Sequence, residues 1–432
     1  MRSSQLYSHD IHEDVQVGVD TIHQIKHKIQ SFHIHTDSWL EEAWYRARST
    51  KFYANIGDFS SERFALLPVV PKPVFKSQFE DFENKNSEGV VKYYETSGTT
   101  GQPTPTRRTK ADLAWNYTGV ALLWSEIIKT SDRSIILLPS DIAPIGDLVA
   151  GCCEIIGCAT ARAYPFTQGM VTWDRLEAIF RNFQPTVIWC SPGTLLQFTR
   201  VLKQRGTFDE VSAHVTKIML SGEVVTKGMK EALESWWSAR VFNASYGSTE
   251  TGTIAAADAN GDLNILQFSF LCEIMKADGS IEPLSAGMEG ELIISSLHGY
   301  ARPFLRLGTG DMVRVLPPVR DLHRLEILGR REETIQIGGK EYLAGDLEDL
   351  IYRIRDVTGY LVQIENGEVS RIVLEQLPAG ASFDDIRDSA QALLSTTEID
   401  VRIDVVSQLP VTTKSGAGLK NWKKSNVVRA SQ

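Results

Sequence analysis

Short apolar runs alternate with amphipathic stretches through the middle of the chain, from residue 110 to residue 250. The apolar runs have the length of buried strands, and the stretches between them place apolar residues at helical spacing. We expect strands at 134–139, 160–166, 186–191, 215–222 and 239–247, and helices at 146–157, 173–183, 192 to about 204, and 227–237. This alternation predicts βα units and a parallel sheet.

After residue 260 the pattern becomes typical of β-structure. Asp278–Gly279 lies between two strand-like runs and predicts a hairpin turn. From about residue 330 a separate unit with both helices and strands can be traced. Its expected elements are a helix at 343–354, a hairpin at 359–377 that turns at Asn366–Gly367, a helix at 383–394 and a strand at 400–406.

These patterns predict an α/β protein with two domains. Residues 1–329 would form a large multi-layer N-terminal domain with mostly parallel sheets plus a β-rich subdomain. Residues 330–432 would form a small α+β C-terminal domain. The length of 432 residues exceeds what one hydrophobic core normally supports, which agrees with this division.

Composition and charge exclude several classes of partner. A net charge of -9 and a pI of about 5.6 argue against nucleic-acid binding. The N-terminus has no apolar signal core and no apolar run approaches a membrane span, so we expect a cytoplasmic protein with no membrane partner. The five cysteines include no CxxC pair and are expected to be reduced and buried. Whether the chain forms a homodimer stays open.

Histidines are concentrated near the N-terminus. His23 and His27 are four residues apart, and His33 and His35 are two residues apart. They could form a metal site or lie on a solvated helix face. We favour the solvated face, because no carboxylate or cysteine completes a familiar ligand pattern.

A run of five small residues follows an aromatic pair early in the chain. It consists of Ser97, Gly98, Thr99, Thr100 and Gly101. Such a run exposes backbone N–H groups and hydroxyls, which suits a phosphate-binding loop and equally suits an ordinary turn. Arg107 and Arg108 follow, either as extra positive charge near a polyphosphate or as a solvated pair.

Three further clusters carry candidate chemistry. The segment at 243–252, "NASYGSTETG", offers a flat face at Tyr246, a hydroxyl at Thr249 and a hard oxygen ligand at Glu250. Asp311 in "LGTGD" could accept both hydroxyls of a ribose, and Arg330 in "ILGRREETIQIGG" could contact ribose or phosphate. Each segment alone could also be a structural turn.

Taken together and in this order, the clusters resemble the adenylate-forming superfamily of acyl-CoA synthetases, luciferases and peptide-synthetase adenylation domains. "TSGTTGQP" is similar to its phosphate loop, "SYGSTETG" to its Tyr-Gly-x-Thr-Glu motif, and "GTGD" and "GRREETIQIGG" to its ribose and hinge motifs. The segments "SGE" at 221–223 and "GEL" at 290–292 also match. The short length, "YRARSTKFY…LLPVVPKPVF" and "GTTGQPT" most resemble the phenylacetate–CoA ligase branch.

The resemblance implies an ATP- and Mg²⁺-dependent ligase. A carboxylic acid would become an acyl-adenylate with release of pyrophosphate, and the acyl group would pass to the thiol of CoA or of a carrier-protein phosphopantetheine. The small domain would be mobile, with its hinge at Glu332.

The resemblance also implies a role for each matched residue. Residues 97–101 would hold the phosphates, Thr249 the α-phosphate, and Glu250 the magnesium ion. Asp311 and Arg330 would hold the ribose. The adenine would lie against Ser221, Gly222, Glu223, Ser245, Tyr246 and Gly247.

The C-terminal tail departs from the superfamily pattern. Ala417 follows Gly416 where the superfamily has a lysine that contacts the carboxylate and the α-phosphate. Lys414 and Lys420 flank this position, and either could enter the site, with Lys414 slightly favoured. Glu341 stands where several relatives carry an arginine, which weakens the expectation of CoA as acceptor.

The acid pocket is expected around residues 140–150, 189–192 and 242–252. Its candidate residues are Asp141, Ile145, Gly146 and Trp189. Asp141 or Asp147 could bind an ammonium group or cap a turn, and Trp189 could line an aromatic pocket or belong to the core.

Two alternatives to the thiol ligase remain. The acceptor could be an amine or the thiol of an acyl or peptidyl carrier protein. The chain could also be a catalytically weak nucleotide-binding relative, because Ala417 replaces the lysine.

Overall fold

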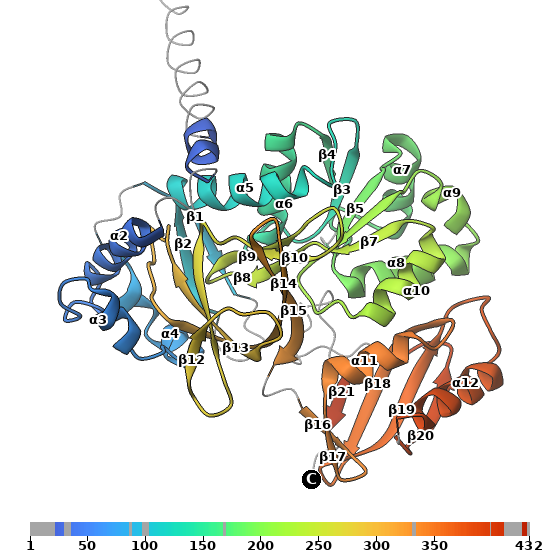
Figure 1. Ribbon diagram of the computed structural model, residues 1–432. Coiled ribbons are helices and arrows are strands. Elements are labelled where there is room, and N and C mark those ends of the chain that lie inside the picture. Colours follow the sequence, from blue (N-terminus) through green and yellow to red (C-terminus); the bar gives the residue numbers. More distant parts are fainter. Residues whose placement is uncertain are drawn as a thin grey trace, which may run out of the picture.

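The structure is a computed structural model, shown as a ribbon in Figure 1. It describes residues 22–29, 36–85, 89–96, 103–166, 170–330, 334–397, 399–409 and 426–429. We call the described residues up to Arg330 the large lobe and those from Thr334 onward the small lobe. The predicted domain boundary at 329/330 stays a prediction, and the predicted hinge residue Glu332 lies outside the described residues.

A five-stranded parallel sheet forms one half of the large lobe, with strand order β4-β3-β5-β6-β7. Its strands are β3 (Arg133–Leu137), β4 (Ala159–Arg162), β5 (Val187–Cys190), β6 (Lys217–Leu220) and β7 (Arg240–Asn243). The helices around it are α5 (Lys110–Trp124), α6 (Ile145–Ile156), α7 (Trp173–Phe183), α8 (Pro192–Arg205), α9 (Phe208–Ser212) and α10 (Lys227–Trp237).

Successive residues of these strands point to opposite faces, so both faces must be apolar. On β5, Trp189 packs in the core shared with α5 and α6, whereas Ile188 packs in the core shared with α7, α8 and α10. Both side chains are fully buried. This explains why the strands read as continuous apolar runs in the sequence.

An eight-stranded antiparallel sheet forms the other half of the large lobe, in the order β12-β11-β13-β14-β15-β10-β9-β8. Its strands are β8 (Ser245–Ser248), β9 (Gly252–Ala257), β10 (Leu263–Ile265), β11 (Phe270–Met275), β12 (Ile281–Pro283), β13 (Glu289–Ser296), β14 (Leu307–Val319) and β15 (Leu322–Arg330). The predicted turn at Asp278–Gly279 joins β11 and β12.

N-terminal segments pack against this second sheet. They comprise α2 (Thr36–Arg48), α3 (Ser61–Leu66), α4 (Lys72–Ser77) and the 3₁₀ turn η2 (Phe79–Phe82). A preceding helix at 22–29 places Ile25 in the apolar cluster that contains residues of α2, α5 and α6. Val70, just before α4, forms a bridge with Leu307, and this fixes α4 beside the start of β14. The antiparallel ribbon of β1 (Val90–Glu95) and β2 (Pro105–Thr109) precedes α5.

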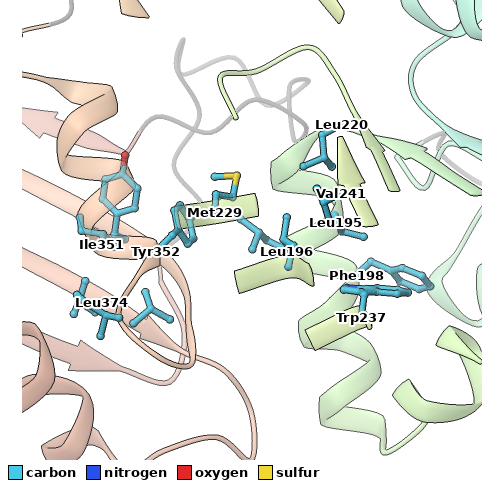
Figure 2. Close-up of a cluster of buried hydrophobic side chains, with 14 of the residues drawn as sticks. Leu195, Leu196, Phe198, Leu220, Met229, Trp237, Val241, Ile351, Tyr352 and Leu374 are labelled. Atoms are coloured by element: carbon cyan, nitrogen blue, oxygen red, sulfur yellow. The ribbon is translucent and has the colours of Figure 1, made fainter. Parts of the chain in front are cut away.

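The small lobe consists of two small sheets and two helices (Figure 1). These elements are β16 (Thr334–Ile337), β17 (Lys340–Leu343), α11 (Ala344–Tyr352), β18 (Val357–Glu365), β19 (Glu368–Gln376), α12 (Phe383–Ser395), β20 (Arg402–Val406) and β21 (Val427–Arg429). Strand order in the larger sheet is β20-β19-β18-β21. Figure 2 shows that the apolar cluster continues from α8 and α10 of the large lobe to Ile351 and Tyr352 of α11.

The predicted fold class is confirmed, with one difference at a functional segment. The strand expected at 239–247 is two strands, because the chain leaves the parallel sheet after Asn243 and enters the antiparallel sheet at Ser245. Ala244, which is fully buried, links the sheets: its N–H donates to Leu220 O and its carbonyl accepts from Ala257 N. The motif "SYGSTETG" therefore begins where the two sheets meet.

Two further expectations concern the cysteines and the membrane. All five cysteines are buried and unpaired, as predicted. Within the described ranges, none of the helices combines the length and apolar character needed to cross a bilayer.

Candidate active site

A cavity of about 2540 Å³ lies at the junction of the two sheets and extends to the small lobe. It exceeds the roughly 300–1,000 Å³ of a typical ligand pocket because it includes the space between the lobes. Most of the predicted site residues that the structure describes line this cavity, although the sequence separates them widely. They are Ile145, Ser221, Gly222, Glu223, Ser245, Tyr246, Gly247, Thr249, Glu250, Asp311 and Arg330.

Tyr246, Asp311 and Arg330 form one contact group on the antiparallel sheet. The Tyr246 hydroxyl donates to Asp311 Oδ2 over 2.8 Å, and Arg330 Nε lies 3.4 Å from Asp311 Oδ1. Asp311 and Arg330 are paired across β14 and β15, so backbone register brings them together. Burial raises the pKa of Tyr246, which keeps its hydroxyl protonated as a donor. The Asp311 carboxylate is thus held in a fixed orientation toward the cavity.

Glu250 is a buried carboxylate at the turn after β8. Its residue is 5% exposed, and Oε1 lies 3.5 Å from Lys76 Nζ. Arg108 Nη2 donates to the carbonyl oxygens of Thr249 and Glu250 over 2.9 and 3.0 Å. These bonds fix the turn, so the Glu250 side chain faces the cavity from a rigid backbone.

The Glu250 carboxylate is the described group that fits a magnesium ion. Within the described part of the chain, no group of three or more His, Cys, Asp or Glu side chains could hold a metal by itself. Magnesium in nucleotide sites usually takes one or two protein carboxylates, with phosphate oxygens and water as the other ligands. A single buried carboxylate such as Glu250 would meet this requirement if phosphate oxygens lay next to it in the cavity.

Ser221, Gly222 and Glu223 follow β6 and reach the cavity from the parallel sheet. Ser221 Oγ lies 2.8 Å from Ser245 Oγ, and the Ser221 N–H donates to Cys190 O. Gly222 has φ of +90°, a conformation that side chains with a Cβ rarely adopt. The loop therefore turns sharply at the carboxyl end of a strand, where ligands of open α/β sheets bind.

Sequence analysis missed a basic wall at this site, formed by Lys72, Lys76, Arg108 and Arg302; it had considered only Arg108, together with Arg107. All four side chains line the cavity. Lys72 Nζ donates to Thr309 O over 2.8 Å, and burial lowers the pKa of its ammonium group while the nearby Asp311 charge opposes that shift. The spacing of Lys72 and Lys76 on one short helix was the only sequence signal, and it equally fits a solvated face.

Several of the residues considered for the site do not line the cavity. Trp189 is fully buried, and its indole N–H donates to Ser134 Oγ, so it is part of the core rather than an aromatic pocket. Arg107 points to Glu83 at the surface, at 2.7 Å. Gly146 is packed against the end of β3, where an added Cβ would lie 2.1 Å from Ser140 Oγ.

The two aspartates considered either for an ammonium group or for a turn cap are paired or exposed. Asp147 is paired with Lys92 at 2.9 Å and Arg162 at 3.3 Å, and it accepts from the Tyr94 hydroxyl. Asp141 is exposed at the protein surface. Neither arrangement provides a buried, unpaired carboxylate for an amino group.

Some predicted residues lie outside the described part of the chain. These are Ser97, Gly98, Thr99, Thr100, Gly101, Glu332, Lys414 and Lys420.

Comparison with known proteins decides the family. The AMP-binding enzyme family matches residues 12–301, which is more than half of the chain. The chain belongs to the AMP-binding enzyme family. This confirms the predicted resemblance to adenylate-forming enzymes.

Curated relatives of this AMP-binding protein include phenylacetate-coenzyme A ligases. The phenylacetate-coenzyme A ligase of Escherichia coli (strain K12) is 25% identical over 284 residues, 63% of this chain. The match spans only 62% of that relative's length. The predicted likeness to the phenylacetate–CoA ligase branch is confirmed.

Solved structures share the fold. A 2-hydroxyisobutyryl-CoA ligase in the postadenylation state, in complex with 2-HIB-AMP, gives a TM-score of 0.76 at 17% identity and covers 91% of this chain and 88% of its own. The same ligase with 2-HIB-AMP and CoA in the thioesterification state gives a TM-score of 0.60 at 17% identity. This match covers 96% of this chain and 90% of that chain. Both matches show that this AMP-binding protein shares the fold of that ligase.

Proposed function

We propose that this protein activates a carboxylic acid with ATP and then transfers the acyl group to the thiol of CoA. A carboxylate oxygen attacks the α-phosphorus, the bond from the α-phosphorus to the bridging oxygen breaks, and its electron pair leaves with pyrophosphate. The thiol then displaces AMP from the acyl-adenylate and loses its proton. The observation that carries this proposal is the convergence of Tyr246, Asp311, Glu250 and Thr249 in one cavity of an AMP-binding enzyme.

Each residue receives a role that its contacts support. Asp311, oriented by Tyr246 and Arg330, accepts the ribose hydroxyls. The ring of Tyr246 and the loop at 221–223 border the adenine. Thr249 contacts the α-phosphate, and Glu250 holds Mg²⁺. When bound, the ion neutralises phosphate charge.

The acid pocket is proposed on the α5–α6 side of the cavity. Tyr94, Tyr117, Ile145 and Leu148 line it there, which suits an apolar or aromatic acid. Because Asp147 is already paired with Lys92 and Arg162, an amino acid held by its ammonium group is not supported.

The acceptor is assigned to CoA by analogy with the relatives named above, whose match is partial. Lys414 or Lys420 would take the place of the lysine replaced by Ala417, and Glu332 would be the hinge between the half-reactions. A carrier-protein thiol or an amine remains the alternative acceptor, favoured by Glu341 at a position where relatives carry an arginine.

ATP–pyrophosphate exchange with a panel of aryl, fatty and amino acids, without CoA, tests the first half-reaction. Acid-dependent exchange supports adenylation and names the acid class. Addition of CoA, an amine or a phosphopantetheinylated carrier protein then identifies the acceptor by product formation. ATP binding with no exchange for any acid would contradict the ligase proposal and favour a nucleotide-binding relative without turnover.

A further inference from the structure

Arg302 is a buried cation with unused hydrogen-bond donors. The residue is 2% exposed and lies in the segment between β13 and β14. Its Nη2 donates to Pro105 O over 2.7 Å and lies 3.3 Å from Glu83 Oε1. Nε and Nη1 are buried and have no hydrogen-bond partner among the residues that the structure describes.

Unpaired donors on a buried guanidinium are costly, since their bonds to water are lost without replacement. Phe75 and Phe79 lie beneath the guanidinium, with ring centroids 5.7 and 5.6 Å from Cζ, and they supply no hydrogen-bond acceptor. Arg302 nevertheless borders the cavity. This combination is typical of a group whose partner is a ligand.

The charges around Arg302 define the sign of that ligand. Burial lowers the pKa of Arg302, and the charges of Glu83, Arg108 and Glu250 also act on it. Glu83 is shared with Arg107, and Glu250 lies among all four cations of the basic wall. Asp112 also acts on Arg108, and Asp311 acts on Lys72. These four carboxylates face the four cations of the wall together with Arg107 and Arg330, so the remaining net charge is positive and favours a polyanion.

Backbone contacts indicate which part of ATP lies there. Arg108, whose charge acts on Arg302, donates to the carbonyl oxygens of Thr249 and Glu250, the residues proposed to contact the α-phosphate and Mg²⁺. Tyr246 and Asp311 mark the adenosine end of the site. Arg302 thus belongs to the phosphate end.

We propose that Arg302 binds the β- and γ-phosphates of ATP and stabilises the departing pyrophosphate. This rests on the proposed function, because it assumes that ATP occupies the cavity. The free Nε and Nη1 donors lie on different edges of the planar guanidinium, so each would donate a single hydrogen bond to a different phosphate oxygen. As the bond to the α-phosphorus breaks, negative charge grows on the leaving bridging oxygen, and a fixed cation lowers the energy of that state.

The test compares binding of Mg-ATP, Mg-pyrophosphate and AMP to the full chain by calorimetry. Arg302→Met removes the charge at similar length, and Arg302→Lys retains it. Arg107→Met is the matched control, because Arg107 shares Glu83 but its side chain is 53% exposed at the surface. We expect Arg302→Met to weaken ATP and pyrophosphate binding by about tenfold or more, Arg302→Lys to restore part of it, and AMP binding to be unchanged.

Several results would overturn the proposal. Equal losses for ATP and AMP would indicate a structural role, and unchanged binding of ATP and pyrophosphate would exclude a phosphate contact. Loss of exchange only for dicarboxylic acids would assign Arg302 to the acid. If the Met variant does not fold, Arg302→Lys decides the question. The proposal would also be contradicted if Arg302→Lys had wild-type thermal stability and the same ratio of ATP affinity to AMP affinity as Arg107→Met and the wild type. If the wild-type protein binds ATP and pyrophosphate but shows no acid-dependent exchange, the proposed ligase function is contradicted while the proposed phosphate contact of Arg302 is not.

Discussion

Arg200 on α8 connects the two lobes, and its removal should separate them. Its Nη1 donates to Thr358 Oγ1 and Gln376 O over 2.8 and 2.9 Å, and its Nη2 donates to Ser407 O over 2.8 Å. It also lies 3.4 Å from Glu375, with both side chains 9% exposed. All four partners belong to the small lobe. We therefore expect Arg200→Met to shift the equilibrium from docked to separated lobes.

The free-energy cost of Arg200→Met depends on whether the former partners of Arg200 stay buried. Hydrogen bonds from a charged donor are worth about 1.5–3 kcal/mol each, and breaking a buried ion pair costs about 3–5 kcal/mol. Separation of the lobes would let water reach Glu375, which limits the loss to about 3 kcal/mol. That is roughly a hundredfold change in the ratio of docked to separated molecules. The apolar cluster that contains Met229 and Tyr352 remains in the variant (Figure 2).

Amide hydrogen exchange in α10 and α11 measures this change, because these helices pack against each other across the lobe interface. Arg205→Met is the matched control, since Arg205 is on the same helix but pairs with Asp174 and Glu177 within the large lobe. The pair with Asp174 is exposed and contributes about 0–1 kcal/mol, and the buried Glu177 keeps Arg181 as a partner in the variant. Wild-type protection of α10 and α11 in Arg200→Met would refute the reasoning.

Three further predictions use other contacts. Gly228→Ala should also weaken the docking of the lobes, because the new Cβ would lie 2.2 Å from Asp349 O. Faster amide hydrogen exchange in α11 would measure this loss, and wild-type protection would contradict the prediction. Tyr246→Phe should weaken AMP binding about tenfold by releasing Asp311, and unchanged calorimetric affinity would exclude that role. Burial lowers the pKa of His298 to about 3. Below about pH 6.5 the unfolded chain therefore binds a proton that the folded chain does not, and the free energy of unfolding decreases as the pH is lowered. His298→Phe should therefore lose about 2 kcal/mol less than wild type in urea unfolding between pH 7 and pH 5, and identical losses would contradict this.

Local patterns predicted the elements well where burial is periodic. The strand at 186–191 and the helix at 173–183 appear as β5 and α7, because a strand buried on both faces and an amphipathic helix each leave a distinct apolar period. The turn at Asn366–Gly367 joins β18 and β19 as expected, since Gly367 has φ of +86°. The strand at 239–247 was predicted as one unit, because periodicity does not record a change of sheet.

The candidate site was predictable only where a residue belongs to a motif. Tyr246, Glu250, Asp311 and Arg330 were predicted in this way, and all four line the cavity, while their individual roles stay predictions. Trp189 was left open between pocket and core, because an aromatic residue after a buried strand fits both.

The sequence by itself determined the order of elements, the family and the motif residues, because these depend on short-range patterns that each segment carries. Only the tertiary structure decided that Lys76 and Arg302, which are 226 positions apart in the chain, approach the same carboxylate of Glu250. A lysine or arginine has no periodicity that reveals its partners. Its role depends on long-range packing, which here brings α4, β2 and the segment before β14 to one wall of the cavity.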